Sequence, residues 1–144
     1  MQTFARVLLT LTVVGYALIP IVADFNETHA TNPKWTPHAR FHVVWQVLSY
    51  VGVGLVAAYL IWIDGPNAQE RLCLAAALSV AIYGGFFAAV GARPVFGGAL
   101  HDDNGYGMLR IPVGARHWRW DVNVSVFAFF STVTLGGVLA VFAS

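Results

Sequence analysis

Charged side chains are scarce in this chain. They make up 10% of its 144 residues, while 58% of the residues are hydrophobic. An ordinary soluble domain contains roughly 25% charged residues, because it must cover its surface with polar groups. The composition therefore excludes such a fold and predicts an integral membrane protein with one domain over residues 1–144.

Cysteine is also rare, and the net charge is close to zero. Cys73 is the one cysteine, so an internal disulfide is excluded and the redox compartment is not indicated. The net charge is only +1 and the basic residues form no cluster, so we expect no nucleic-acid partner.

Long apolar runs are what the sequence has in abundance. Four runs, at about 4–23, 41–63, 72–92 and 122–143, approach or exceed the ~20 residues that a helix needs to cross a bilayer. Backbone groups in lipid must be paired internally, which favours helices over strands. The first run exceeds the roughly 7–15 apolar residues of a signal peptide core, so we interpret it as a retained helix. The predicted fold class is all-α: an integral membrane four-helix bundle with a long polar loop between the third and fourth helices.

The histidines are confined to two polar segments. All five lie in residues 24–42 and 91–121, namely at His29, His38, His42, His101 and His117. An even number of crossings places both segments at one membrane face. Six of the eight basic residues share these segments, and this bias predicts a cytoplasmic location for the histidine-bearing face of a protein in a bacterial-type inner membrane. Since histidine is the commonest metal ligand, the chemistry is expected at this end.

The second helix carries the sharpest motif. Thr36 is a suitable N-cap and Pro37 suits the first helical position, so His38 and His42 would lie four residues apart on one helix face. Two such imidazoles can share a metal if another residue supplies a third ligand. The candidates for that ligand are Asp24, Glu27, His29, His101 and Asp102. The alternative is that these histidines only bind water, headgroups or backbone carbonyls.

Three further residues are candidate catalytic groups. Gln46 continues the face of His42 one turn deeper, and Tyr83 lies beside two glycines near the histidine-bearing end of the third helix. Tyr83 could donate a proton to a bound oxygen or could simply pack. Arg40 could lie among headgroups, or could pair with Asp24, Asp102 or Asp103 and fix the loops over the bundle.

The sequence Ala39-Arg40-Phe41-His42 resembles the start of the second helix in bacterial styrene oxide isomerase. That family comprises small four-helix membrane proteins that bind haem b through a histidine and convert an epoxide into an aldehyde. The resemblance implies that His42 is the haem ligand. The family also has an asparagine shortly after this histidine that helps to hold the substrate, where this chain offers Gln46 out of register. The other four histidines have no counterpart that we can place, which leaves a non-haem transition metal open.

Three functions follow from these observations. The first is a membrane isomerase in which haem or a metal at His42 acts as a Lewis acid on a small lipophilic epoxide or carbonyl substrate, while Tyr83 or Gln46 steadies the oxygen. The second is a non-haem enzyme, redox or hydrolytic, with several histidine ligands. The third is a non-enzymatic accessory subunit that holds a lipid, quinone or pigment. In each case we expect contact with membrane lipid and a homo-oligomer.

Overall fold

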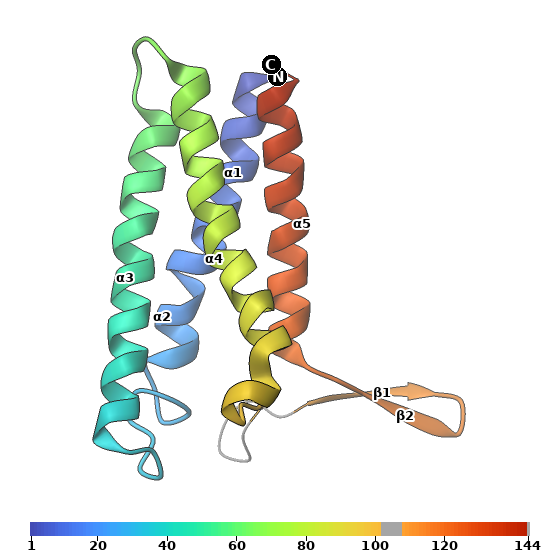
Figure 1. Cartoon of the computed structure of the whole chain (residues 1–144). Helices are drawn as coiled ribbons and strands as arrows, with labels where there is room; N and C mark the ends of the chain where they lie inside the picture. Colours follow the sequence, from blue (N-terminus) through green and yellow to red (C-terminus); the bar gives the residue numbers. More distant parts are fainter. Residues whose placement is uncertain (102–107, 144) are drawn as a thin grey trace.

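The computed structural model describes residues 1–101 and 108–143, and it is mostly helical. The helices are α1 (Gln2–Ala17), α2 (Ile19–Asp24), α3 (Pro37–Trp62), α4 (Ala68–Phe96) and α5 (Val122–Phe142). A hairpin of β1 (Leu109–Val113) and β2 (Arg116–Trp120) lies between α4 and α5. The segments Gln2–Asp24, Pro37–Trp62, Ala68–Phe96 and Val122–Phe142 are long and apolar enough to cross a membrane (Figure 1).

The predicted helices are confirmed as elements, although their bounds differ. The second begins at Pro37, ahead of its apolar run and as the capping residues predicted, and the side chain of Thr36 accepts a hydrogen bond from the backbone N–H of Ala39 at 3.2 Å. The third continues to Phe96 and ends at Gly97, whose φ of +66° suits a left-handed helix cap. Asp121 caps α5 through the N–H of Val124 at 3.2 Å.

The first predicted helix is interrupted, although its apolar run was predicted to form one continuous helix. α1 ends at Ala17 and α2 begins at Ile19, with Pro20 in its first turn. Proline has no N–H and its ring clashes with the carbonyl four residues earlier, so a straight helix cannot pass through this point. α1 packs against α3, α4 and α5, whereas α2 contacts α3 (Figure 1).

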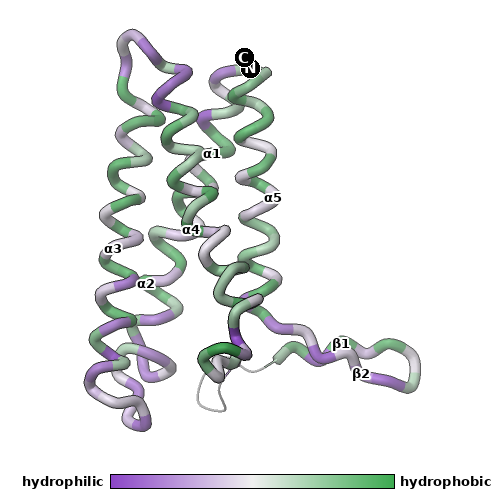
Figure 2. Tube along the Cα trace, in the orientation of Figure 1, coloured by the Kyte–Doolittle hydropathy of each residue, from purple (hydrophilic) through white to green (hydrophobic). Residues whose placement is uncertain are grey.

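Small residues bring the helices together in the half of the bundle that contains both termini. A Cβ atom on Gly54 would lie 2.6 Å from Cβ of Ala17, and one on Gly137 would lie 3.0 Å from Cδ2 of Leu9. The fully buried side chains Leu9, Tyr16, Ile61 and Leu72 fill this half. Exposed apolar residues occur along the whole length of the helices. Hydrophobic positions predominate along the helices, and hydrophilic positions gather toward the ends of the bundle (Figure 2).

Both polar segments lie at the same end of the bundle, as the even number of crossings predicted. The loop after α2 and the hairpin before α5 are found at the end opposite the two termini (Figure 1). The hairpin lies in the segment where a long polar loop was expected, so it adds a strand pair to the predicted all-α fold. Gly114, with a φ of +61°, provides the two-residue turn that joins its strands.

Candidate functional site

A cavity of about 540 Å³ lies among the helices in the half of the bundle that carries the polar segments. Each of the four apolar segments contributes to its wall, and residues 99–100 lie beside it. The break at Leu18 helps to form it, because α2 leaves the course of α1 and contacts α3. The lining includes Gly15, Ile19, Pro20, Ala23, Asp24, His29, Trp35, Val43, Gln46, Tyr50, Tyr83, Phe86, Ala89, Val90, Arg93, Asn123, Val126, Phe127 and Phe130.

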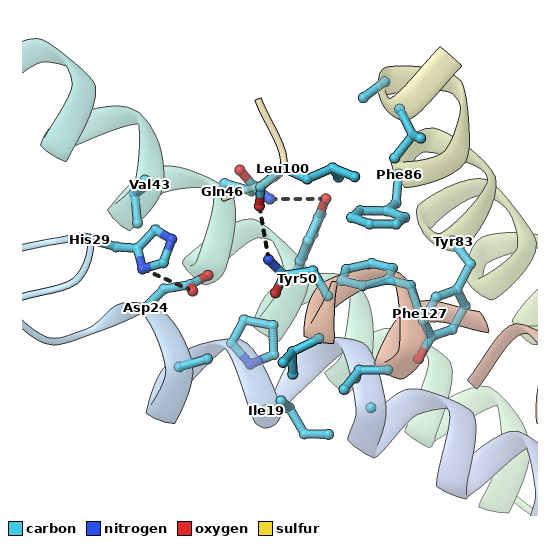
Figure 3. A pocket seen from close by; sticks show the side chains of 18 of the residues that line it. Ile19, Asp24, His29, Val43, Gln46, Tyr50, Tyr83, Phe86, Leu100 and Phe127 are labelled. Carbon is cyan, nitrogen blue, oxygen red and sulfur yellow. Dashed lines mark hydrogen bonds and ion pairs between the residues drawn. The ribbon is translucent and has the colours of Figure 1, made fainter. Parts of the chain in front are cut away.

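Aromatic rings form the deeper wall of the cavity. Phe86 and Phe127 stack with ring centroids 3.7 Å apart, and the ring of Tyr83 meets that of Phe127 edge-on at 5.8 Å (Figure 3). Tyr83 is only 4% exposed, and its hydroxyl donates a hydrogen bond to the carbonyl oxygen of Thr12 at 2.9 Å. Its hydroxyl proton therefore already has an acceptor in the backbone of α1.

Asp24 and His29 lie at the opposite side of the cavity (Figure 3). Nδ1 of His29 is 3.7 Å from Oδ1 of Asp24 and 2.8 Å from Oγ1 of Thr28. Oγ1 of Thr28 is also 2.6 Å from Oδ1 of Asn26, which can only accept. The single hydroxyl proton of Thr28 thus points to Asn26, so we assign Nδ1 of His29 as the donor to Thr28.

The loop that presents His29 is held by its own side chains. Oδ1 of Asn26 accepts from the N–H of Thr28 at 2.8 Å, and Nδ2 of Asn32 donates to the carbonyl oxygen of Thr28 at 3.1 Å. Asn32 is 1% exposed, and its Oδ1 accepts from the N–H of Lys34 at 3.0 Å. Trp35 adds an edge-on ring contact with His29 at 5.2 Å. The short polar residues of this segment therefore hold the imidazole beside the cavity.

Further polar groups line the cavity between these two sides. Nε2 of Gln46 donates to the hydroxyl oxygen of Tyr50 at 3.3 Å, one turn along α3. Nδ2 of Asn123 donates to the carbonyl oxygen of Leu100 at 3.2 Å (Figure 3). Arg93, half-buried near the end of α4, also lines the cavity. A molecule held here would meet aromatic carbon at one end and hydrogen-bonding groups at the other.

The predicted site residues fall into separate places. Gln46 and Tyr83 line the cavity with His29, whereas His38 and His42 lie on an exposed face of α3 outside the lining, with their Nε2 atoms 3.0 Å apart. Arg40 is half-buried at the start of α3 and does not line the cavity either.

Among the described residues, the other proposed metal ligands do not join His38 and His42. His101 is half-buried, and its Nδ1 has no hydrogen-bond partner among the described residues. Asp102 and Asp103 lie outside the described residues. Within residues 1–101 and 108–143, no three His, Cys, Asp or Glu side chains converge as a metal site would require. The predicted metal and haem ligation therefore stays a prediction.

Several residues of the cavity were not predicted from the sequence. Arg93, Asn123 and Phe127 drew no functional interpretation, because an arginine at the end of an apolar helix commonly just extends to the membrane interface. The signal that could have located the cavity is Pro20, because a proline within an apolar helix predicts a kink or break there.

The fold and the cavity define a small helical protein with four helices of membrane-crossing length and an internal ligand-sized space. The chain belongs to a family of unknown function, DUF6640, whose model matches residues 8–100. This match spans most of α1 together with α2, α3 and α4, and so includes Asp24, His29, Gln46 and Tyr83. No curated protein and no solved structure matches the chain.

Proposed function

We propose that this protein is an integral membrane four-helix bundle that binds a small lipophilic molecule bearing an oxygen function. The observation that carries the proposal is the division of the cavity into an aromatic side and a polar side. Its volume of about 540 Å³ lies within the range of small-molecule sites, roughly 300–1,000 Å³. The four apolar segments support a location in the membrane, and a lipophilic ligand would be dissolved in the same bilayer.

The polar side suggests how the oxygen would be held. A bound hydroxyl, carbonyl or epoxide oxygen can accept from Nε2 of Gln46 or from the hydroxyl of Tyr50, since both groups carry donor hydrogens. Asp24 and His29 add a carboxylate and an imidazole, the pair that proton-transfer enzymes use as acid and base. This pair favours an isomerase that moves a proton on the bound molecule, and the aromatic wall would keep water from the reacting carbon.

The Lewis-acid isomerase with haem or a metal at His42 is a second form of this proposal. It is favoured by the resemblance around Ala39-Arg40-Phe41-His42 and by the 3.0 Å approach of His38 and His42. The two nitrogens lie at hydrogen-bonding distance, and on one tetrahedral zinc ion at ~2.0–2.1 Å they would lie a little farther apart, at about 3.3–3.4 Å. A metal on these two nitrogens would lie at the start of α3 and outside the cavity lining, so the two forms place the ligand in different parts of the protein.

One pair of substitutions separates these forms. The protein, purified from its membrane in mild detergent, would be titrated with an aromatic epoxide, the matching aldehyde and a hydrocarbon of the same skeleton. The cavity proposal expects the oxygenated compounds to bind more tightly than the hydrocarbon, with this preference lost in Gln46→Leu and kept in His42→Ala. The opposite dependence on the two residues would move the site to His38 and His42. Equal binding of all three compounds would overturn recognition of oxygen.

An absorption spectrum and an elemental analysis of the same sample test the cofactor directly. A Soret band that disappears in His42→Ala would support haem, and stoichiometric iron, copper or zinc without that band would support the non-haem site. The distribution of Lys and Arg favours an orientation in which the cavity end faces the cytoplasm. Labelling of a single introduced cysteine at His117 from one side of intact cells would test it.

A further inference from the structure

The hairpin β1–β2 stands apart from the helices. It leaves the bundle directly before α5 and extends sideways from the helices (Figure 1). All ten residues of its two strands are exposed. An isolated two-stranded hairpin is marginally stable in water, so this one requires another surface to keep its form.

Strand pairing gives the hairpin two different faces. Directly paired residues project to the same side, and the register is Leu109–Trp120, Arg110–Arg119, Ile111–Trp118, Pro112–His117 and Val113–Arg116. Alternate pairs therefore collect five apolar side chains on one face, with Arg116 beside the turn. The apolar set is Leu109, Ile111, Val113, Trp118 and Trp120. The opposite face carries Arg110, Arg119, His117 and Pro112.

The charges of the hairpin all have one sign. Residues 109–120 contain three arginines and no acidic residue. Arg110 lies directly across from Arg119, and like charges in this position destabilise a strand pair. An anion bound to the two guanidinium groups would remove that repulsion, and phosphate accepts paired hydrogen bonds from arginine well. The hairpin therefore fits a surface that is apolar beneath and carries phosphate groups.

The connection to α5 fixes the hairpin at the end of a membrane-length helix. Only Asp121 separates β2 from α5, and the indole N–H of Trp120 donates to the hydroxyl of Ser125 in the first turn of α5. Tryptophan is enriched where a helix leaves the hydrocarbon core, because its ring is apolar and its N–H is polar. The exposed fractions of 60% for Trp118 and 51% for Leu109 measure apolar surface that this chain leaves uncovered.

We propose that the hairpin lies on the membrane surface and binds anionic phospholipid. The face with Trp118 and Trp120 enters the boundary between headgroups and acyl chains, and the guanidinium groups of Arg110 and Arg119 bind lipid phosphates. This inference rests on the membrane location proposed above, and it is independent of the ligand in the cavity.

Spin labels on alternate residues of the full chain test this inference. In a Cys73→Ala background, Ile111→Cys, Pro112→Cys and Leu48→Cys would each be labelled in nanodiscs of phosphatidylcholine, with or without phosphatidylglycerol. Relaxation by oxygen reports lipid, and relaxation by a water-soluble nickel chelate reports water. We expect the oxygen-to-chelate ratio to be several-fold higher at 111 than at 112. We also expect phosphatidylglycerol to raise the ratio at 111, and the double change Arg110→Gln with Arg119→Gln to abolish that rise.

Position 48 separates this inference from the membrane proposal. Leu48 is an exposed residue of α3, so its label should show the high ratio of a lipid-facing site. An aqueous label at 111 with a lipid-exposed label at 48 would overturn the hairpin inference alone, and aqueous labels at both would overturn the membrane location too. Shielding of both 111 and 112 from both reagents would indicate a protein partner and overturn the lipid assignment. An oxygen-to-chelate ratio at 111 that does not change with phosphatidylglycerol would overturn the proposed preference for anionic lipid.

Discussion

Oδ1 of Asp24 lies 3.7 Å from Nδ1 of His29, so a carboxylate that ends α2 faces an imidazole from the following loop across a short gap at the cavity. About a quarter of each side chain is exposed, at 25% for Asp24 and 27% for His29. Partly exposed pairs contribute little to stability, on the order of 0–1 kcal/mol. We therefore expect Asp24 and His29 to contribute to ligand binding in the cavity rather than to stability.

Asp24→Asn tests this expectation, because it keeps the shape of the side chain and removes its charge. We expect the tightest-binding oxygenated compound to lose affinity several-fold, while the free energy of unfolding in detergent changes by no more than about 1 kcal/mol. Isothermal titration and thermal unfolding measure the two quantities. Glu27→Gln is the matched control, since Glu27 is an exposed acid of the same loop outside the cavity lining. Equal losses of affinity in both variants would contradict the prediction.

The break at Pro20 gives a second prediction. Pro20→Ala restores an N–H that can bond to the carbonyl four residues earlier, so α1 and α2 are expected to join into one helix. That change would draw α2 away from α3 and narrow the cavity, so affinity should fall although stability does not. Hydrogen exchange should show a protected amide at position 20.

Pro37→Ala provides the control for that experiment. Pro37 lies in the first turn of α3, where an N–H has no acceptor within the helix, so its replacement should leave affinity and stability nearly unchanged. A Pro20→Ala protein that binds as tightly as the original would show that the break does not create the cavity.

Gly15 permits close contact between α1 and the aromatic wall. A Cβ atom at this position would lie 2.5 Å from Oη of Tyr83 and 2.6 Å from Cδ1 of Phe130. Gly15→Ala should therefore destabilise the protein by roughly 1–3 kcal/mol, the usual cost of overpacking. Gly52→Ala is the control, because nothing lies within 4 Å of its added Cβ. Thermal unfolding of the two variants gives the comparison, and similar midpoints would contradict the predicted contact.

The helices were predictable because local residues specify them. Thr36 and Pro37 mark the start of α3 through capping chemistry that depends on only four neighbouring residues. The hairpin was not predicted, although Leu109, Ile111 and Val113 alternate with other residues. Pro112 lies within this run, and a proline there argues against a strand. Gly114 was the available signal, as a glycine that can adopt a positive φ between two short alternating runs.

The candidate site was predictable only in part, because it depends on contacts between distant segments. His29 and Gln46 were singled out from residue type and spacing, and both line the cavity. The pairing of Phe86 with Phe127 joins α4 to α5, and no local pattern encodes such a contact. His38 and His42 show the converse, because their spacing correctly placed them side by side but could not tell that the cavity lining begins deeper along α3 than His42.

Arg71 closes the turn between α3 and α4. Its guanidinium group donates to the carbonyl oxygens of Ile63 at 3.0 Å, of Gly65 at 3.2 Å and of Pro66. Arg71→Gln should lower the free energy of unfolding by about 1.5–3 kcal/mol, the usual value for hydrogen bonds to a charged group. Glu70→Gln, at the exposed neighbouring residue, should have little effect on the thermal midpoint, and equal effects would show that the turn does not depend on the guanidinium group.

Tyr83→Phe distinguishes a proton donor from a structural residue. The change keeps the ring against Phe127 and removes the hydroxyl that donates to the carbonyl oxygen of Thr12. A structural role predicts a loss of about 0.5–1.5 kcal/mol in unfolding free energy, with ligand affinity and any isomerase turnover nearly unchanged. A proton-donating role predicts instead that turnover falls by roughly 10²–10⁴-fold, as general acid catalysis is lost.

Tyr50→Phe is the matched comparison, because its hydroxyl faces the polar side and accepts from Gln46 rather than donating to the backbone of α1. Since the hydroxyl proton of Tyr83 is already bound by Thr12, we expect Tyr50→Phe to weaken binding of oxygenated ligands and Tyr83→Phe to affect chiefly stability.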